Sequence, residues 1–154
     1  MAMLRADFDW DEHEERTDPD PPTRPARVLV VDDDPSTRAL VRRSLERVGY
    51  EVIEAADATE VFVENDTFRP SRWPEGDVDL LVVDLCLPKR SGLEVLSVLR
   101  TGRWTTPAIL MTAFLDRDVR RAADFLGVPV LAKPFSLASL TATALQVLLA
   151  REAS

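Results

Sequence analysis

The stretch from Val78 to Gly92 constrains the fold of this chain more than any other part of its sequence. It contains an unbroken apolar run, Leu80 to Val83, whose composition is typical of a strand buried on both faces of a parallel sheet. Asp84 ends the run, and a proline, a serine and a glycine then lead into leucines at helical spacing. Open sheets that alternate with helices bind ligands beyond the carboxyl ends of their strands. Asp84 therefore occupies the position where such a sheet carries its chemistry.

The same alternation of apolar runs and helical patterns recurs along the rest of the chain. Short apolar runs predict four more strands, at residues 28–31, 50–55, 108–113 and 128–132. Helical periodicity predicts a helix after each strand. The first two helices are expected at residues 35–48 and 58–64. The third begins at about residue 92, the fourth ends at residue 126, and the last begins at residue 137. Five strand–helix repeats predict an α/β fold, a doubly wound, five-stranded parallel sheet with helices on both faces. Pro129 places the fifth strand at an edge of that sheet.

Each helix is expected to turn its apolar residues toward the sheet. For the first helix these residues are Leu40, Val41, Leu45 and Val48. For the fourth helix they are Val119, Ala122, Ala123 and Leu126, and for the last helix Leu137, Leu140, Ala144, Leu145 and Leu148.

Composition excludes several classes of protein. A chain of 154 residues has room for one domain with a full core. It has no apolar run near the ~20 residues of a membrane span and no signal peptide, so we expect no membrane partner. A single cysteine, Cys86, leaves no internal disulfide, so a reducing cytoplasm is the expected location. The net charge of −8 argues against nucleic acid as a direct partner, since phosphate binding needs a basic face.

Acidic residues and prolines are concentrated in the first 26 residues, which hold 8 of the 27 acids and 4 of the 11 prolines. Such a segment buries too little apolar surface to offset its ordering entropy, so we expect a disordered tail at 1–26 before a domain at 27–154. Leu4, Phe8 and Trp10 interrupt the acids, either as a short docking motif or as part of a solvated leader. A second long connection, residues 65–77 with Trp73, has no assigned role.

Polar side chains follow the predicted strands and converge at one edge of the parallel sheet. They are Asp32 and Asp33 after the first strand, Asp84, Thr112 at the end of the fourth, and Lys133 after the fifth. Several carboxylates in one place repel one another unless a cation lies among them, and hard oxygen ligands suit Mg²⁺. A hydroxyl and an ammonium supply the donors and positive charge that a transferring phosphoryl group needs. Asp84 is the predicted nucleophile.

These residues resemble the receiver domain of two-component response regulators, over about Arg27 to Ala150. The similarity lies in four motifs that occur in order and with similar spacing. They are Val-Asp-Asp-Asp-Pro at 31–35, Asp-Leu-Cys-Leu-Pro-Lys-Arg-Ser-Gly at 84–92, Thr-Ala at 112–113 and Lys-Pro-Phe at 133–135. The resemblance implies a flavodoxin-like sheet with strand order 2-1-3-4-5.

For the metal, the resemblance implies that Asp33 and Asp84 bind Mg²⁺ directly and that Asp32 acts through water. The main-chain carbonyl of Cys86 would complete the protein ligands. Asp84 would accept a phosphoryl group from the phosphohistidine of a sensor histidine kinase or a histidine phosphotransfer protein. Receivers catalyse only their own phosphorylation and dephosphorylation, so we do not expect another enzymatic activity.

The resemblance also implies that Thr112, Ala113 and Lys133 bind the phosphoryl group. Receivers often have a cis peptide after this lysine, and an aromatic three residues before it that moves with the hydroxyl residue. In this chain Val130 occupies the position three residues before the lysine, so the aromatic partner that would move with Thr112 at this switch position is absent. We therefore expect the response to phosphorylation in the loop after Thr112, where Phe114 and Leu115 are large apolar residues. The downstream protein would meet the face of the fourth helix, fifth strand and last helix.

Nothing in these 154 residues resembles an output domain, so the chain is expected to act as a stand-alone receiver that docks to another protein or relays its phosphoryl group. Two alternatives use part of the same residues. A haloacid-dehalogenase-like phosphatase would share the Asp-x-Asp of 32–34 but needs an acidic motif beyond the lysine, where only Glu152 remains. A degenerate receiver serving as an adaptor would lack an acid or the lysine. Chemical phosphorylation of the purified protein distinguishes the three hypotheses. A stable phosphoryl adduct would favour the receiver, continuous turnover of the donor would favour the phosphatase, and an unmodified protein would favour the adaptor.

Overall fold

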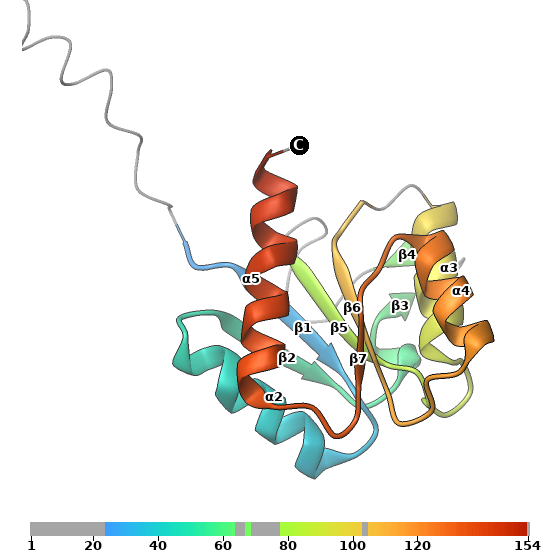
Figure 1. Ribbon diagram of the computed structural model, residues 1–154, viewed down its shortest axis with the longest axis horizontal. Coiled ribbons are helices and arrows are strands. Elements are labelled where there is room, and N and C mark those ends of the chain that lie inside the picture. The colour runs from blue at the N-terminus through green and yellow to red at the C-terminus, as the bar shows by residue number, and fades with distance from the viewer. Residues whose placement is uncertain (1–23, 64–66, 69–77, 103–104, 154) are drawn as a thin grey trace, which may run out of the picture.

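A five-stranded parallel sheet forms the centre of the protein, whose computed structural model describes residues 24–63, 67–68, 78–102 and 105–153 (Figure 1). The strands lie in the order β2-β1-β5-β6-β7 and all pair in parallel. Their bounds are Arg27–Val31 for β1, Glu51–Ala55 for β2, Leu80–Asp84 for β5, Ala108–Thr112 for β6 and Val130–Ala132 for β7. This arrangement confirms the predicted fold class and strand order, with β7 at an edge.

Four α-helices cover the two faces of the sheet (Figure 1). Helices α2 (Pro35–Arg47) and α5 (Leu137–Ala153) pack on one face, and α3 (Gly92–Thr101) and α4 (Arg117–Leu126) pack on the other. Successive residues of β1 alternate between the two cores, because side chains of a strand point to opposite faces in turn. Both central strands, β5 and β6, are buried along their full length. Their continuous apolar runs are the consequence of this burial.

Local signals set the helix ends. Asp34 caps α2 by accepting from the backbone N–H groups of Ser36 and Thr37, and Asp116 caps α4. Ser91 and Glu94 form a reciprocal capping box at the start of α3. Gly127 ends α4 in the left-handed region, with φ 72°, directly after the predicted end of this helix at residue 126. Among the described helices, none has the length and hydropathy needed to cross a bilayer.

The helix predicted at residues 58–64 is not present. Ala58–Glu60 form one 3₁₀ turn capped by Asp57, and two short strands follow, β3 (Phe62–Val63) and β4 (Thr67–Phe68), which pair antiparallel. The sequence Val-Phe-Val at 61–63 is β-branched and aromatic, which favours an extended chain over a second helical turn. In the described residues the sheet is therefore covered by four α-helices, two on each face, and not by the five that were predicted. The remainder of the predicted connection, including Trp73, lies outside the described residues.

Helix burial differs from the prediction at four leucine and valine positions. Leu40 and Val48 of the first helical segment are 47% and 54% exposed, and Leu137 and Leu145 of α5 are 39% and 51% exposed. A stripe of four or five apolar positions spans a wider arc than a flat sheet covers, so its outer members stay in solvent. The buried positions are Val41, Ser44 and Leu45 in α2 and Leu140, Ala144 and Leu148 in α5.

Arg24 is the first of the described residues, and it contacts the domain. Its Nη1 lies 2.8 Å from Asp79 Oδ2, and the carbonyl oxygen of Ala26 accepts a hydrogen bond of 3.0 Å from the backbone N–H of Glu51. Ala26 also packs against the core below α2 and α5. Residues 24–26 thus contact the domain at the amino end of the sheet, whereas residues 1–23 of the predicted tail lie outside the described residues.

Candidate functional site

The carboxyl edge of the sheet brings the predicted polar residues together. Asp84 ends β5 and Thr112 ends β6, while Asp32 follows β1 and Lys133 follows β7. Asp32 and Thr112 are fully buried, and Asp84 is 5% exposed. The parallel register aligns these strand ends, with Val31 beside Val83 and Asp84 beside Met111. Residues that are as many as 101 positions apart in the chain therefore share one small site.

Three carboxylates form the centre of this site. Oxygen atoms of Asp32, Asp33 and Asp84 all lie within 4.8 Å of one another, and they are the acidic group among the described residues that is arranged to hold a metal ion. Asp32 and Asp84 are buried, while Asp33 is exposed and opens one side to solvent. A site with hard oxygen ligands and an open, solvated side fits Mg²⁺, which keeps several of its waters in proteins. The residues present therefore fit the cation.

Lys133 supplies the positive charge facing these acids. Its Nζ lies 2.8 Å from Asp84 Oδ1 and 3.3 Å from Asp32 Oδ2. Burial lowers the pKa of the Lys133 ammonium, but the hydrogen bond to Asp84 and the charges of Asp32 and Asp84 outweigh this effect and raise it. The lysine therefore stays charged in the site.

One ammonium does not balance three carboxylates. Burial is the main cause that raises the pKa of Asp84, and the charges of Asp32 and Asp33 add to it against the opposing hydrogen bond from Lys133. The site therefore destabilises the ionised form of Asp84, and a bound cation would stabilise that form. A pKa perturbed by burial and by like charges is typical of functional sites.

Arg38 positions Asp32, a role that the sequence did not indicate. Its Nη1 donates a 2.6 Å hydrogen bond to the main-chain carbonyl of Asp32, and its Nε lies 2.8 Å from Glu54 of β2. Asp32 Oδ1 in turn accepts a 2.9 Å hydrogen bond from the backbone N–H of Asp34. The signal available in sequence was weak, namely an arginine one turn into α2 and an acid on the adjoining strand. Asp34 itself caps α2, so its carboxylate serves the helix and not the cluster.

Thr112 and Lys133 are coupled through the backbone. The N–H of Lys133 donates a 2.7 Å hydrogen bond to the carbonyl of Thr112 across the β6–β7 pair. Thr112 Oγ1 accepts a 2.9 Å hydrogen bond from the N–H of Phe114, which leaves its hydroxyl proton available to another acceptor. The Lys133–Pro134 peptide is cis, as the resemblance implied. The backbones that carry the hydroxyl and the ammonium are therefore held side by side at this edge of the sheet.

Gly92 allows α3 to begin directly against the end of β5. A Cβ atom at this position would lie well inside van der Waals contact of the carbonyl oxygen of Asp84, and close to Leu110. The N–H of Gly92 donates a 2.8 Å hydrogen bond to the carbonyl of Leu85, which closes the loop after Asp84. Cys86 lies in this loop with its thiol exposed. Gly92 is thus a positioning residue for Asp84, which the sequence had indicated only as a helix start.

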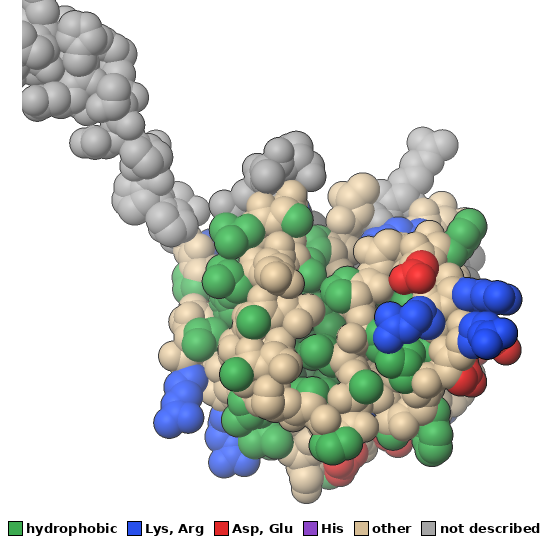
Figure 2. Space-filling view, viewed as in Figure 1, with side chains coloured by type: hydrophobic (Ala, Val, Ile, Leu, Met, Phe, Trp, Pro, Cys, Tyr) green, Lys and Arg blue, Asp and Glu red, His purple; other side chains and the backbone are tan. Residues whose placement is uncertain are grey.

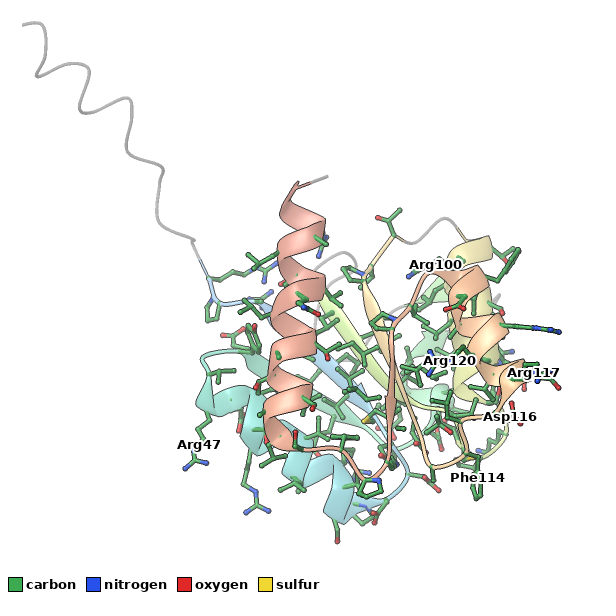
Figure 3. All side chains as sticks on the ribbon, in the orientation of Figure 1. Arg47, Arg100, Phe114, Asp116, Arg117 and Arg120 are labelled. Atoms are coloured by element: carbon green, nitrogen blue, oxygen red, sulfur yellow. The ribbon has the colours of Figure 1, made fainter. Side chains whose placement is uncertain are left out.

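The switch position and the loop after β6 differ in exposure. Val130 is partly buried and packs against the core on the α3–α4 side. Phe114 is 70% exposed and projects from the loop between β6 and α4 (Figure 3). Ala113 is exposed beside it. The large apolar side chain in this region thus lies in the loop and not at the position before the lysine.

Comparison with known proteins agrees with this geometry. Residues 28–145 match the family described as the response regulator receiver domain. The chain is 36% identical over 111 residues to the alkaline phosphatase synthesis transcriptional regulatory protein PhoP of Bacillus subtilis, covering 71% of this chain and 43% of that protein. It is 33% identical over 118 residues to the transcriptional regulatory protein PdtaR of Mycobacterium tuberculosis, covering 75% and 53%. The chain therefore spans about half the length of these curated relatives.

Solved structures show the same architecture. The chemotaxis protein CheY4 of Vibrio cholerae is 28% identical, with a TM-score of 0.65 over 80% of this chain and 98% of that one. A response regulator receiver domain protein from Clostridium thermocellum is 25% identical, with a TM-score of 0.68 over 82% and 97%. With the site geometry, the family match and these relatives in agreement, this chain belongs to the response regulator receiver domain family.

Proposed function

We propose that the chain takes a phosphoryl group onto Asp84 from the phosphohistidine of a partner histidine kinase or histidine phosphotransfer protein, in a Mg²⁺-dependent reaction. Membership of the receiver family supports phosphorylation-based signalling in general. The observation that carries the assignment to Asp84 is its place between Lys133 Nζ at 2.8 Å and the carboxylates of Asp32 and Asp33. Asp32 is also buried beside Lys133, but its contact with the ammonium is longer, at 3.3 Å, and its other oxygen accepts a hydrogen bond from the N–H of Asp34. Asp33 is exposed.

In the proposed step an oxygen of Asp84 attacks phosphorus, a new O–P bond forms, and the N–P bond to the imidazole breaks. The electron pair of that bond stays on the imidazole nitrogen of the donor. Lys133 turns from the Asp84 carboxylate toward the phosphoryl oxygens, which carry the charge it then balances. The Thr112 hydroxyl donates a hydrogen bond to one of these oxygens, and the main-chain N–H of Ala113 donates a second hydrogen bond. We propose no enzymatic activity for the chain beyond its own phosphorylation and dephosphorylation.

Asp33 and Asp84 would hold the cation directly, the Cys86 carbonyl would be a third protein ligand, and Asp32 would act through water. When bound, Mg²⁺ supplies positive charge that offsets the carboxylates and the phosphoryl oxygens. Asp32 is held in place for this role by the hydrogen bonds from Asp34 and Arg38. The exposed side at Asp33 gives the cation and the phosphoryl donor access.

We further propose that the signal leaves through the loop after β6. The hydrogen bond from Phe114 N–H to Thr112 Oγ1 links the hydroxyl to the loop directly, and Val130 is too short to replace a buried ring. When Thr112 moves toward the phosphoryl group, Phe114 moves with it and changes the face made by α4, β7 and α5. A downstream protein in the cytoplasm would dock there. NMR spectra of the free and beryllofluoride-bound chain test this: changes confined to Asp33, Asp84 and Lys133, with α4 and α5 silent, would contradict it.

The test of the phosphorylation site uses a small phosphoryl donor such as acetyl phosphate with Mg²⁺ and intact-protein mass spectrometry. The wild-type chain should gain the mass of one phosphoryl group, and Asp84→Asn should gain none while staying folded. Asp34→Asn is the matched control, because Asp34 is the neighbouring acid that caps α2 and should leave phosphorylation intact. A phosphoryl group on Asp84→Asn would refute the assignment. Continuous turnover of the donor would instead indicate a phosphatase, and an unmodified wild-type chain would indicate an adaptor.

A further inference from the structure

A cavity of about 640 Å³ lies at the amino end of the sheet, on the side opposite the phosphorylation site. It is bounded by the entry segment at Arg24, by the turn between α2 and β2, and by the last turns of α5. Apolar side chains form much of its wall. Val48, Leu145 and Leu149 are 54%, 51% and 54% exposed there. Figure 2 shows hydrophobic side chains gathered over the α5 side of this face.

Leu145 and Leu149 lie outside the part of α5 that contacts the sheet, where Leu140, Ala144 and Leu148 are buried. An exposed apolar patch rimmed by charge is typical of an interaction site. Two arginines, Arg24 and Arg151, lie at the rim here, and both contact Asp79. The cavity therefore suits a ligand that offers large apolar side chains together with negative charge.

The sequence before Arg24 has this composition. Residues 1–23 hold eight acids, and Asp-Phe-Asp-Trp-Asp at 7–11 alternates acids with aromatics. In an extended chain, alternate residues face opposite sides, so Phe8 and Trp10 would share one side and the acids the other. Aromatic residues are also the side chains most enriched at protein interfaces.

The chain length permits this segment to reach the cavity. Arg24 lines the cavity, so the 23 residues that precede it are attached to the domain at the edge of the cavity. Trp10 is 14 positions before Arg24, which corresponds to at most about 46 Å of extended chain. That length is sufficient to turn back over a domain of this size, and a tethered segment has a high effective concentration at a site beside its own anchor.

We propose that residues 7–11 dock in this cavity of the same chain, with Phe8 and Trp10 against Leu145, Leu149 and Val48. Asp7, Asp9 and Asp11 then lie on the outer side of the segment, where the positive charges of Arg24 and Arg151 at the rim attract them over a longer distance. This inference concerns the amino end of the sheet and does not depend on phosphoryl transfer at Asp84.

The experiment is NMR on the full chain with labelled methyl and amide groups. We expect nuclear Overhauser contacts between the Trp10 ring and the methyls of Leu145 and Leu149. The double substitution Phe8→Ser, Trp10→Ser should remove these contacts and shift the amides of the α2–β2 turn, Val48 to Tyr50. High salt should weaken the contacts, since surface charge pairs are screened.

Leu145→Ser tests the cavity from the other side, and Phe125→Ser is its matched control. Both positions are exposed leucine or phenylalanine side chains on helices, at 51% and 90%, but Phe125 lies on α4, which packs on the other face of the sheet. Leu145→Ser should release Trp10, and Phe125→Ser should not.

Three results would overturn the proposal. The first is the absence of contacts from Trp10, with shifts confined to the neighbours of the substituted residues. This result would show that residues 7–11 do not occupy the cavity. The second is an unchanged Trp10 signal in Leu145→Ser. The third is that the contacts appear only between labelled and unlabelled chains in a mixed sample, which would assign the cavity to the segment of a second copy.

Discussion

Strand β5 has an aspartate at each end, and the surroundings of the two acids are opposite. Asp79, just before the strand, accepts hydrogen bonds of 2.8 Å from both Arg24 Nη1 and the backbone N–H of Arg27. Arg151 Nη1 of α5 lies 3.3 Å from its other oxygen. Burial raises the pKa of Asp79, but these hydrogen bonds and charges outweigh burial and lower it. This carboxylate is fully paired and ties the entry segment, β5 and α5 together.

Asp84, at the far end of the same strand, has Lys133 as its partner and two carboxylates as neighbours. Burial and these like charges raise its pKa. The comparison teaches that burial alone does not set the pKa of an acid, since both side chains are largely removed from solvent. What differs is the balance of charge: Asp79 contacts two arginines, whereas Asp84 lies beside two further carboxylates, the setting in which we propose that it binds a cation and is phosphorylated.

The largest difference between the two ends is expected when each loses its cation. Lys133→Met removes the ammonium at 2.8 Å from Asp84, so the initial rate of phosphorylation by acetyl phosphate should fall by about 100-fold, the usual loss for one preorganised donor. Arg24→Met removes the cation at 2.8 Å from Asp79 and should leave that rate unchanged. Intact-mass time courses measure both. Equal losses in the two variants would show that the ends are not independent.

Two glycines extend the comparison to the backbone. Gly92→Ala forces a Cβ atom against the Asp84 carbonyl, so the loop must shift and phosphorylation should slow at least about tenfold, as for other small displacements of reacting groups. Gly127→Ala at the amino end meets no atom within 4 Å but keeps a φ of 72°. It should cost about 1 kcal/mol of stability and leave the phosphorylation rate unchanged. Urea unfolding together with phosphorylation kinetics separates these outcomes, and a slow rate in Gly127→Ala would contradict them.

Much of the carboxyl end could be predicted from the sequence, because buried parallel strands are continuous apolar runs and polar residues mark their ends. Asp32, Asp84, Thr112 and Lys133 were assigned to one edge by this rule alone, and the structure places them there. The rule works because chain topology converts positions far apart in the sequence into neighbours along one edge of the sheet.

Features set by tertiary contact could not be predicted in this way. The close approach of Gly92 to Asp84 depends on the angle at which α3 meets β5, and the contact of Arg38 with the Asp32 carbonyl depends on how α2 lies on the sheet. The same holds for Leu145, whose helical position suits burial but lies beyond the width that the sheet covers. Periodicity indicates a direction on a helix, and it does not indicate how wide the opposing surface is.

Stabilisation of the fold by Mg²⁺ should depend on the acids at the carboxyl end of the sheet and not on Asp79 at the amino end. Mg²⁺ at ten times its dissociation constant should raise the free energy of unfolding of the wild-type chain by about 1.4 kcal/mol. Asp33→Asn should lose most of this increase, and it should fold normally because Asp33 is exposed. Asp79→Asn should keep the increase in full. Thermal unfolding with and without Mg²⁺ measures the difference, and a Mg²⁺ effect that survives in Asp33→Asn would place the cation elsewhere.

The smallest effect concerns Asp79 and pH. Asp79→Asn keeps the shape of the side chain and removes the charge that meets Arg24 and Arg151, which are partly exposed, so screening limits the loss to about 1 kcal/mol at neutral pH. Because the pKa of Asp79 is lower in the folded chain than its ordinary value of 3.8, its contribution is present above that value and is lost as the pH falls through the folded pKa. The difference in unfolding free energy between wild type and Asp79→Asn should therefore be constant from about pH 5 upward and shrink below pH 4. A difference that persists unchanged in acid would mean that Asp79 acts through its shape and hydrogen bonds, and that the charge balance at the amino end of β5 contributes little to stability.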